Sequence, residues 1–253
     1  MSEFEPRLAA ASLSGVADAA WADRAAEHVG CAFLGGIALD EPTRDAARQL
    51  RDRDREEFLP EDPIAFIDRE LSALAAVDLR PAINVRAATP EPIERAAAVC
   101  AEHDAILEVN AHCRQAEMCA AGAGESLLRE PERLRRQVAA AATDGVTVSV
   151  KLRAELDGVD LPAVSETAID AGASVLHVDA MDTESIVAAL SDSAFVVANN
   201  GVRRRCHVEE YFGYGADAVS VGRPSDRPAV LSRLREAVEA VGSSRHEEAT
   251  ADD

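Results

Sequence analysis

The segment VTVSVKLRAEL, residues 146–156, contains the only lysine in a chain of 253 residues. Within it, valine and leucine alternate with threonine, serine, Lys151 and Arg153. This alternation predicts a β-strand whose apolar side chains pack against helices and whose polar side chains lie on the opposite face. Because arginine occupies the other 25 of the 26 basic positions, we infer that position 151 requires a compact ammonium that a guanidinium cannot replace.

Similar short apolar runs recur along the chain, separated by amphipathic segments whose apolar residues repeat at intervals of three and four. There are eight such runs, at residues 8–11, 31–34, 82–85, 106–109, 147–152, 175–178, 195–198 and 218–221. Eight strands that alternate with helices predict a parallel (β/α)8 TIM barrel, an α/β fold.

The interval between the second and third runs is longer than the others. It holds EPTRDAARQLRDRDREEF, residues 41–58, which predicts a charged helix, and a second helical pattern over residues 63–77. We expect a solvated helical insertion to which we assign no chemistry. The barrel is expected to span residues 1–241 as a single domain, followed by a disordered acidic tail over residues 242–253.

The composition limits the environment and the partners. The chain carries 46 acidic and 26 basic residues, for a net charge of −20, which indicates halophilic solvation and argues against a polyanionic partner. Five scattered cysteines without a CxxC pair predict reduced thiols and no metal site. No apolar run reaches membrane-spanning length and the N-terminus does not resemble a signal peptide, so we expect a cytoplasmic protein without a membrane partner.

Active sites of TIM barrels lie at the carboxyl ends of the strands. The alternation places eight polar residues on the inner face near these ends, namely Asn84, Arg86, Glu108, Asn110, Lys151, Arg153, His177 and Asp179. Structural interpretations stay open for three residues. Lys151 could be the buried partner of an acidic residue, His177 a core histidine, and Cys113 a small buried hydrophobe.

The segment LEVNAHCRQAEMCAAGAGESLLREPERL, residues 107–134, carries a family resemblance. Asn110 is followed three residues later by Cys113, and then by a glycine-rich turn over residues 121–124 that leads into a helix. This pattern resembles the fourth-strand motif of the tRNA-dihydrouridine synthases, which are FMN-dependent barrel enzymes. Further matches occur in the order of the family, as SGVAD at residues 14–18, VKLR at 150–153, NNG at 199–201 and GR at 222–223.

The resemblance implies FMN as the cofactor and a role for each matching position. Cys113 would give a proton to a pyrimidine carbon while the reduced flavin gives hydride to the neighbouring carbon, and Asn110 would face the substrate. Lys151 would stabilise negative charge on the reduced flavin. The implied cofactor-binding residues are Lys151 and Arg153 at the flavin ring, Asn84 near the ring, His177 and Asp179 on strand six, and Asn200, Gly201, Gly222 and Arg223 around the phosphate.

Several positions differ from the family pattern. Pro-Met of the family is Ser12-Leu13 here, and the Gly and Pro that flank the family cysteine are His112 and Arg114. The family's helical RNA-binding domain would follow the barrel, whereas this sequence has only a short polar segment after residue 241. We therefore expect tRNA to be a weak partner, because phosphate contacts also weaken with salt.

The expected function is FMN-dependent reduction of a pyrimidine C5=C6 bond, in uridine of tRNA or in a related pyrimidine. Three alternatives stay open. The strand-four pattern also resembles that of the dihydroorotate dehydrogenases, which implies oxidation of a free dihydropyrimidine. A desolvated Lys151 suits a Schiff-base lyase, and the altered residues around Cys113 suit a flavin-binding barrel without catalytic activity.

Overall fold

The computed structural model describes residues 3–142 and 145–251, with side chains up to residue 242. Eight parallel strands close into a barrel in which each strand pairs with its neighbours in sequence and β1 pairs with β8. The strands are β1 (Leu8–Ala10), β2 (Cys31–Ala38), β3 (Arg80–Arg86), β4 (Ile106–Asn110), β5 (Thr147–Arg153), β6 (Val175–Asp179), β7 (Phe195–Asn199) and β8 (Ala218–Val221). Every predicted apolar run forms a strand, so the prediction of an α/β TIM barrel is confirmed.

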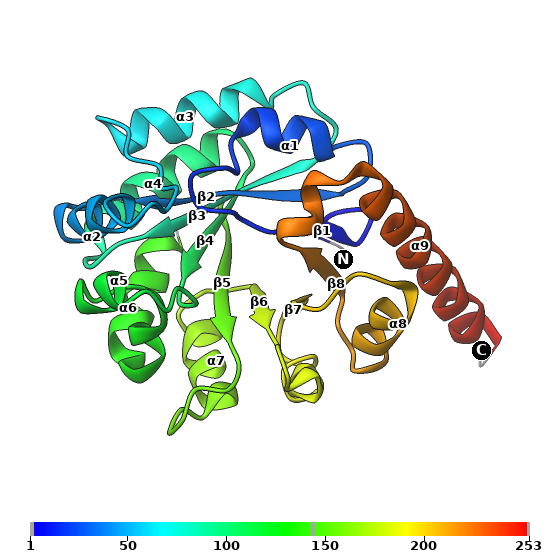
Figure 1. The fold of residues 1–253 in the computed structure, drawn as a ribbon. Coiled ribbons are helices and arrows are strands. Elements are labelled where there is room, and N and C mark those ends of the chain that lie inside the picture. Colours follow the sequence, from blue (N-terminus) through cyan, green and yellow to red (C-terminus); the bar gives the residue numbers. More distant parts are fainter. Residues whose placement is uncertain (1–2, 143–144, 252–253) are drawn as a thin grey trace.

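Helices lie around the outside of the strands (Figure 1). Outside the insertion they are α1 (Ala19–Ala25), α4 (Glu91–Glu102), α5 (Ala116–Ala120), α6 (Pro131–Ala141), α7 (Leu161–Asp170), α8 (Arg205–Gly213) and α9 (Pro228–Ala251). Short 3-10 helices complete three of the connections, as η1 (Gly124–Arg129), η2 (Glu184–Ala189) and η3 (Arg223–Asp226). The carboxyl ends of all eight strands meet at one end of the barrel, which we call the mouth.

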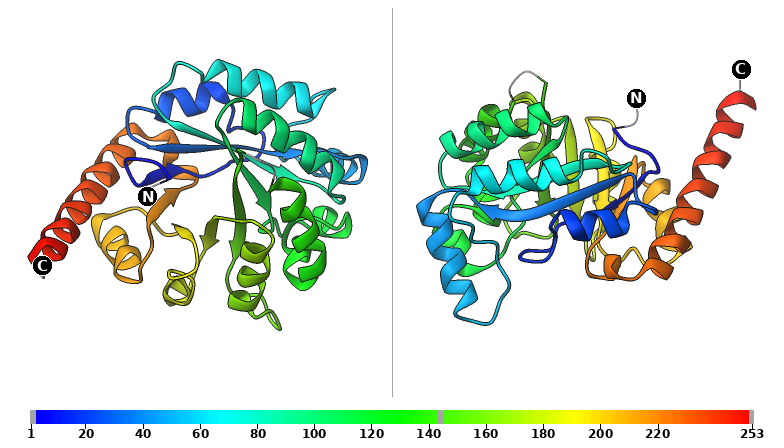
Figure 2. Two further views of the ribbon diagram at one scale, coloured as in Figure 1. Left: turned by 180° about the vertical axis from the view of Figure 1, so that it is seen from behind. Right: turned by 90° about the horizontal axis from the view of Figure 1, so that it is seen from above.

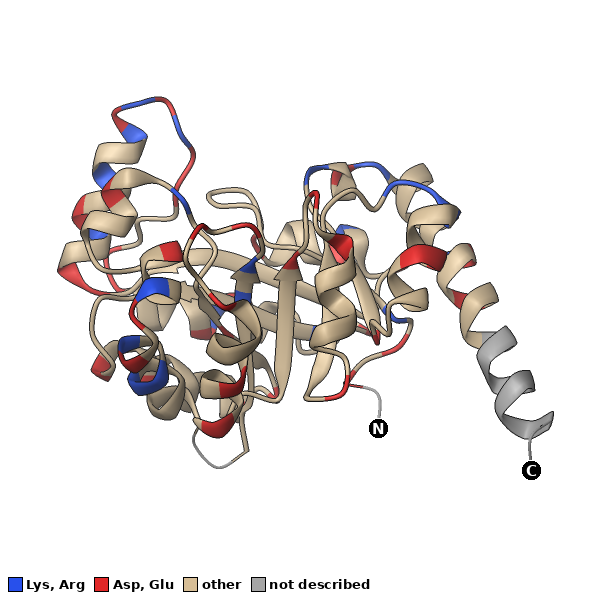
Figure 3. Ribbon diagram, turned by 90° about the horizontal axis from the view of Figure 1, so that it is seen from below, with Lys and Arg blue, Asp and Glu red and all other residues tan. Residues whose placement is uncertain are grey.

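Aspartates begin several of the helices. The side chains of Asp18, Asp40, Asp62 and Asp160 accept hydrogen bonds from backbone N–H groups in the first turns of α1, α2 (Glu41–Arg51), α3 (Pro63–Ala73) and α7. Such a cap satisfies donors that a helix leaves unpaired and typically stabilises a protein by about 1 kcal/mol. Part of the acidity therefore has a structural role, while Figure 3 shows other Asp and Glu positions distributed over helices and loops around the barrel.

The predicted insertion between β2 and β3 is present as α2 (Glu41–Arg51) and α3 (Pro63–Ala73). Its role differs from the expected one. The segment between these helices brings Glu57 to Arg86 at the end of β3, where Oε2 and Nη1 are 2.7 Å apart in a buried ion pair. The insertion therefore forms part of the barrel mouth and is more than a solvated surface.

The interior of the barrel changes character along its axis. Toward the amino ends of the strands it is filled by a fully buried apolar cluster that includes Cys31, Phe33, Ala82, Ile106, Val175, Val197 and Ala218. Toward the mouth the inward side chains are polar. A larger apolar core fills the space between the strands and the surrounding helices. The barrel thus has an apolar floor that supports a polar upper half.

The first half of helix α9 packs on the core through Leu231, Leu234 and Val238, and the helix then extends beyond the barrel (Figure 2). The domain boundary expected at residue 241 falls inside this helix. The disorder expected for residues 242–253 stays a prediction, because residues 252–253 and the side chains from residue 243 onward lie outside the described part of the chain. Within the described ranges, no helix has both the length and the apolar character that crossing a membrane requires.

Candidate active site at the barrel mouth

Glu108 on β4 lies at the centre of the polar half of the barrel and has no exposed surface. Its carboxylate accepts hydrogen bonds from Asn84 Nδ2 at 2.7 Å, from Ser149 Oγ at 3.1 Å and from His177 Nδ1 at 2.6 Å. These partners come from three other strands, so the inner-face placement predicted from the alternation is confirmed. Burial raises the pKa of Glu108, but His177 and Lys151 lower it by more. The pKa therefore lies below its ordinary value, and the group is a carboxylate at neutral pH.

His177 extends this network toward β8. Its Nε2 accepts a hydrogen bond from Ser220 Oγ at 2.7 Å, and Ser220 Oγ accepts one from Asn199 Nδ2 at 2.7 Å. Burial lowers the pKa of His177 more than Glu108 raises it, so the imidazole is neutral. A neutral ring can donate to Glu108 from Nδ1 while accepting at Nε2, and both nitrogens are therefore occupied.

Asn110 connects the network to Cys113. Its Nδ2 donates to Asn84 Oδ1 at 2.9 Å, while its Oδ1 accepts from the backbone N–H groups of His112 at 3.1 Å and Cys113 at 2.9 Å. The following turn passes through Gly124, where φ is +64° and a Cβ atom would lie 2.2 Å from the Cys113 carbonyl oxygen. Position 124 therefore requires glycine, and Asn110 fixes the loop that carries Cys113.

Lys151 on β5 is only 4% exposed. Its ammonium has no hydrogen bond or ion pair with any side chain in the described ranges. Burial lowers the pKa of Lys151. The carboxylates of Glu108 and Asp179, which form no ion pair with the ammonium, offset this lowering only in part. Enclosing a cation without an ion pair costs free energy, and groups with a pKa shifted by desolvation are concentrated at functional sites. Lys151 is therefore the strongest indication of a ligand site in the barrel.

Arg86 is a buried cation at the end of β3. Its Nη1 pairs with Glu57 and its Nη2 donates to Ser14 Oγ. Burial lowers the pKa of Arg86, but Cys113 and Glu57 more than offset that effect, and the pKa lies above its ordinary value. Its Nε is buried and has no hydrogen-bond partner within the described chain. Arg86 is thus a cation fixed by Glu57 and Ser14, and its charge interacts with Cys113.

His112 and Asp179 form a second polar pair at the mouth. His112 Nε2 and Asp179 Oδ2 are 2.5 Å apart, and the histidine side chain keeps 32% of its surface exposed. Burial lowers the pKa of His112 more than the bond to Asp179 raises it. Burial raises the pKa of Asp179, but hydrogen bonds from His112 and Asn200 hold it well below its usual range. Because the carboxylate only accepts, Nε2–H donates, and Nδ1 is left available for proton transfer.

Arg153 follows Lys151 on the inner face of β5 and binds the turn next to Cys113. Its Nη1 donates to Glu125 Oε2 at 3.1 Å, and the backbone N–H of Glu125 donates to the Cys113 carbonyl at 2.9 Å. Its Nε is buried without a partner in the described chain. Glu125 therefore connects the end of β5 to the loop that carries Cys113.

The turns after β7 and β8 lie at the standard phosphate-binding position of TIM barrels. Asn200 has a φ of +87° and donates from Nδ2 to Asp179 Oδ1 at 2.8 Å, and the N–H of Gly201 donates to Asn200 Oδ1 at 2.8 Å. A Cβ atom added at Gly201 or Gly222 would meet no atom within 4 Å, so the space above both turns is open. Arg223 follows Gly222 and lines a pocket rich in arginine.

The predicted site residues occupy two levels at the same end of the barrel. Those at the mouth are Asn110, Cys113, Lys151, Arg153 and Asp179, with Asn200, Gly201, Gly222 and Arg223 on the β7–β8 side. Asn84 and His177 lie deeper and have no exposed surface, so they can influence a ligand only through the residues above them. Neither Glu57 nor His112 had a role predicted from the sequence, although His112 stands where the family pattern has a glycine.

No family model matches this chain. It is 23% identical over 236 residues to the uncharacterized protein MJ0144 of Methanocaldococcus jannaschii, with 88% of this chain and 90% of the relative covered. A proposed lyase/mutase from Burkholderia cenocepacia J2315 is similar in structure with a TM-score of 0.57 and 17% identity, covering 91% of this chain and 81% of that one. A cube-shaped protein cage designed from fused symmetric oligomeric domains is similar in structure with a TM-score of 0.54 and 15% identity. The match covers 96% of this chain and 77% of the cage chain. At these identities the two solved structures support the barrel fold alone.

Proposed function

We propose that the protein is an FMN-dependent oxidoreductase of the dihydrouridine synthase type, which reduces the C5=C6 bond of a pyrimidine. The observation that carries this proposal is Lys151, whose side chain is almost completely enclosed at the mouth and forms no ion pair with a described side chain. A ligand that develops negative charge would supply the missing partner. A flavin does so on the N1 and C2 carbonyl side of its ring when it is reduced.

The surrounding residues fit this cofactor. The open space over the glycine turns after β7 and β8 suits a phosphate group, because a glycine lets an anion come close to the backbone. The residues that would hold FMN are Lys151, Arg153, Asn200, Gly201, Gly222 and Arg223.

Bound flavin would supply hydride transfer, and the chain itself would supply the proton and the alignment. Cys113 is the proposed proton donor, because its loop is anchored by Asn110 from the strand and by Glu125 from the following turn. Asn84 and His177 would act indirectly, since both hold the carboxylate of Glu108 beneath the mouth. Their proposed contribution is positioning without direct contact with the ring.

The proposed substrate is a pyrimidine, either uridine in tRNA or a related free base or nucleoside. A tRNA substrate would approach a chain with a net charge of −20. Its phosphate contacts would also weaken steeply with salt. We therefore favour the smaller pyrimidine as the primary substrate, with tRNA as a weak partner.

A Schiff-base lyase is the second candidate, and it is favoured by the lowered pKa of Lys151. Burial is the main cause of that shift, and desolvation is one of the ways in which enzymes make a lysine nucleophilic enough to form an imine. The similar barrel from Burkholderia cenocepacia, a proposed lyase/mutase, is consistent with this class. Two carboxylates near the amine, Glu108 and Asp179, would be available for the accompanying proton transfers.

The visible spectrum of the purified protein separates the two candidates. We expect a yellow protein that releases FMN on denaturation and that is not trapped by borohydride in the presence of carbonyl substrates. A colourless protein that also fails to bind added FMN would exclude the flavin function. Covalent trapping of a carbonyl compound on Lys151, identified by mass spectrometry, would establish the lyase instead.

Cys113→Ala is expected to leave FMN bound and reducible while turnover of the unsaturated substrate falls by roughly 10²-fold or more, the usual range for loss of a general acid. The measurement is rapid-mixing absorbance of flavin reduction and of its reoxidation by substrate. Flavin reduction should be unchanged, and only the substrate-dependent step should slow.

His112→Gln is the matched control for Cys113→Ala, because His112 is the neighbouring group that could transfer a proton at the mouth. It should have a much smaller effect than the cysteine variant. If the histidine variant loses turnover and the cysteine variant keeps it, the proton comes from the His112–Asp179 pair and the assignment of Cys113 is wrong.

A further inference from the structure

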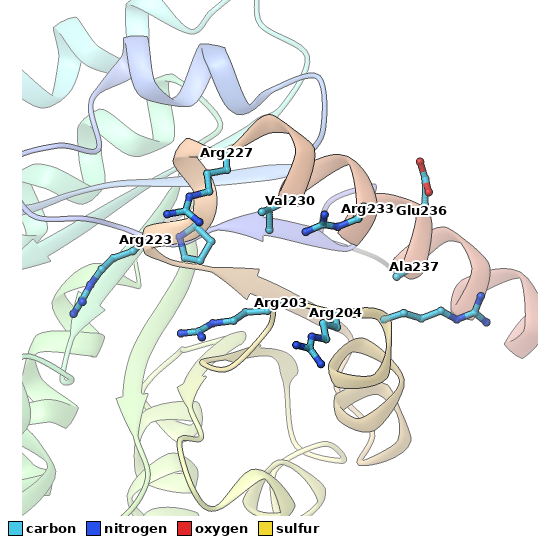
Figure 4. Close-up of a pocket in the computed structure, with 10 residues that line it drawn as sticks. Arg203, Arg204, Arg223, Arg227, Val230, Arg233, Glu236 and Ala237 are labelled. Carbon is cyan, nitrogen blue, oxygen red and sulfur yellow. The ribbon is translucent and has the colours of Figure 1, made fainter.

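A pocket lined by arginines lies beside the mouth, between the loop after β7, η3 and the first half of α9. Its volume is about 920 Å³, and six of its lining residues are Arg203, Arg204, Arg205, Arg223, Arg227 and Arg233. Figure 4 shows Arg203 and Arg204 on one side and Arg223, Arg227 and Arg233 on the other. Glu236 is the acidic residue in the same lining. This concentration of positive charge is unexpected in a chain with a net charge of −20.

Most of these arginines are not neutralised by the protein. Arg205 pairs with Glu209 at 2.6 Å, and Arg227 lies 3.8 Å from Asp226. For the four others, no ion pair with a described side chain is present. In addition, α8 begins at Arg205 without a side-chain cap, so its first N–H groups can bind an anion. One phosphate monoester carries roughly 1.5 to 2 negative charges. The positive charge in the pocket is larger than a single such group would neutralise.

The volume and the remaining walls indicate what kind of anion fits. Pockets of roughly 300–1,000 Å³ hold ligands of drug or cofactor size, and a single phosphate would leave most of this pocket empty. Pro224, Val230 and Ala237 add an apolar wall to the cationic one. We propose that this pocket binds a nucleotide with at least two phosphate groups, with the phosphates on the arginines and the base against the apolar wall.

A nucleic acid is a less suitable occupant than a small nucleotide. A duplex or a folded RNA needs an extended basic surface, whereas the arginines here line one pocket and acidic positions are distributed over the rest of the fold (Figure 3). The phosphate of FMN, which we place over the turns at Gly201 and Gly222, would engage only the edge of the pocket at Arg223. The inference holds whether or not the barrel binds a flavin.

The test is calorimetric titration of the whole protein with ADP, AMP, adenosine, inorganic phosphate and a single-stranded RNA dodecamer, each with and without saturating FMN. ADP should bind at least tenfold tighter than AMP, and adenosine should give no measurable binding. The double variant Arg204→Gln/Arg233→Gln should weaken ADP binding at least tenfold. Both positions are exposed, so the fold should be unaffected.

The matched control is Arg95→Gln/Arg136→Gln, which removes two exposed arginines outside the pocket and makes the same change in net charge. It should leave the affinity for ADP within twofold of wild type. The proposal is overturned if ADP binds no tighter than inorganic phosphate, or if both double variants weaken it equally. It is also overturned if FMN abolishes ADP binding, because the pocket would then be the site of the flavin phosphate. A third contrary outcome is that the RNA binds tighter than ADP and loses affinity in the Arg204→Gln/Arg233→Gln variant.

Discussion

Lys151→Arg is expected to weaken FMN binding by roughly 5- to 150-fold and to slow flavin reduction, although the substitution preserves the positive charge. The wider guanidinium must either displace the ring or leave N–H groups unpaired in a confined space, and such costs typically reach about 1–3 kcal/mol. It would also bring donors closer to Asp179, which already acts on the amine electrostatically. An ion pair with Asp179 would neutralise the positive charge that the lysine leaves free to interact with a ligand.

The measurements are FMN affinity by fluorescence titration and flavin reduction by stopped-flow absorbance, with circular dichroism to establish that the fold is intact. Arg153→Lys is the matched control, because it makes the reverse exchange two residues along the same inner face. Its partner Glu125 is partly exposed and can still pair with an ammonium, so the effect should be severalfold at most. Unchanged FMN affinity and reduction in Lys151→Arg would show that charge alone is sufficient at position 151.

The same variant also tests the alternative function. An arginine cannot form a Schiff base, so Lys151→Arg would abolish covalent trapping completely in a lyase. A flavin enzyme would instead show a graded loss of affinity that added FMN partly restores. The two functions therefore predict different responses to one substitution.

The strands could be predicted from sequence because their apolar runs follow a simple rule. Each run is buried against helices on its outer face, and this requirement leaves a regular pattern in the sequence. The inner-face residues followed from the same alternation. Asn84, Glu108 and His177 are on three different strands, yet their hydrogen bonds confirm that all three point into the barrel.

The level of each residue along the barrel axis could not be predicted in the same way. Alternation assigns a face but not a depth, because the depth depends on the stagger between paired strands. In the structure, Lys151 pairs with both Asn110 and His177 along the strands. However, the lysine and the asparagine reach the mouth, whereas His177 is enclosed between Glu108 and Ser220. Only the folded geometry separates a ligand-facing position from one that supports it.

The contribution of the insertion was also hidden from sequence. Glu57 lies in a run of charged residues, 51–57, in which the other six are exposed. Its burial depends on Arg86, which is 29 residues away in the chain. A long-range ion pair of this kind leaves no local pattern, so neither residue could be assigned to the other before the structure was known.

Glu108→Ala is expected to lower the free energy of unfolding at pH 7 by about 3–5 kcal/mol, the range found when one partner of a buried charged network is removed. The substitution would leave Asn84 Nδ2, Ser149 Oγ and His177 Nδ1 without their acceptor. It would also remove the carboxylate that contributes most to offsetting the effect of burial on the pKa of Lys151. Denaturant titration measures the loss. Glu102→Ala, an exposed change on α4, should stay within about 0.5 kcal/mol of wild type.

The pH dependence of the same variant tests whether the charge of Glu108 is the cause. The pKa of Glu108 is lowered in the folded protein. Its stabilising contribution is therefore complete above the unfolded-state pKa of about 4.3 and is lost as the pH falls through the lower folded-state pKa. The difference in stability between wild type and Glu108→Ala should consequently be constant near neutral pH and shrink below about pH 4. A difference that is independent of pH over this range, or a loss below about 1 kcal/mol at pH 7, would show that the buried carboxylate does not hold the barrel interior together.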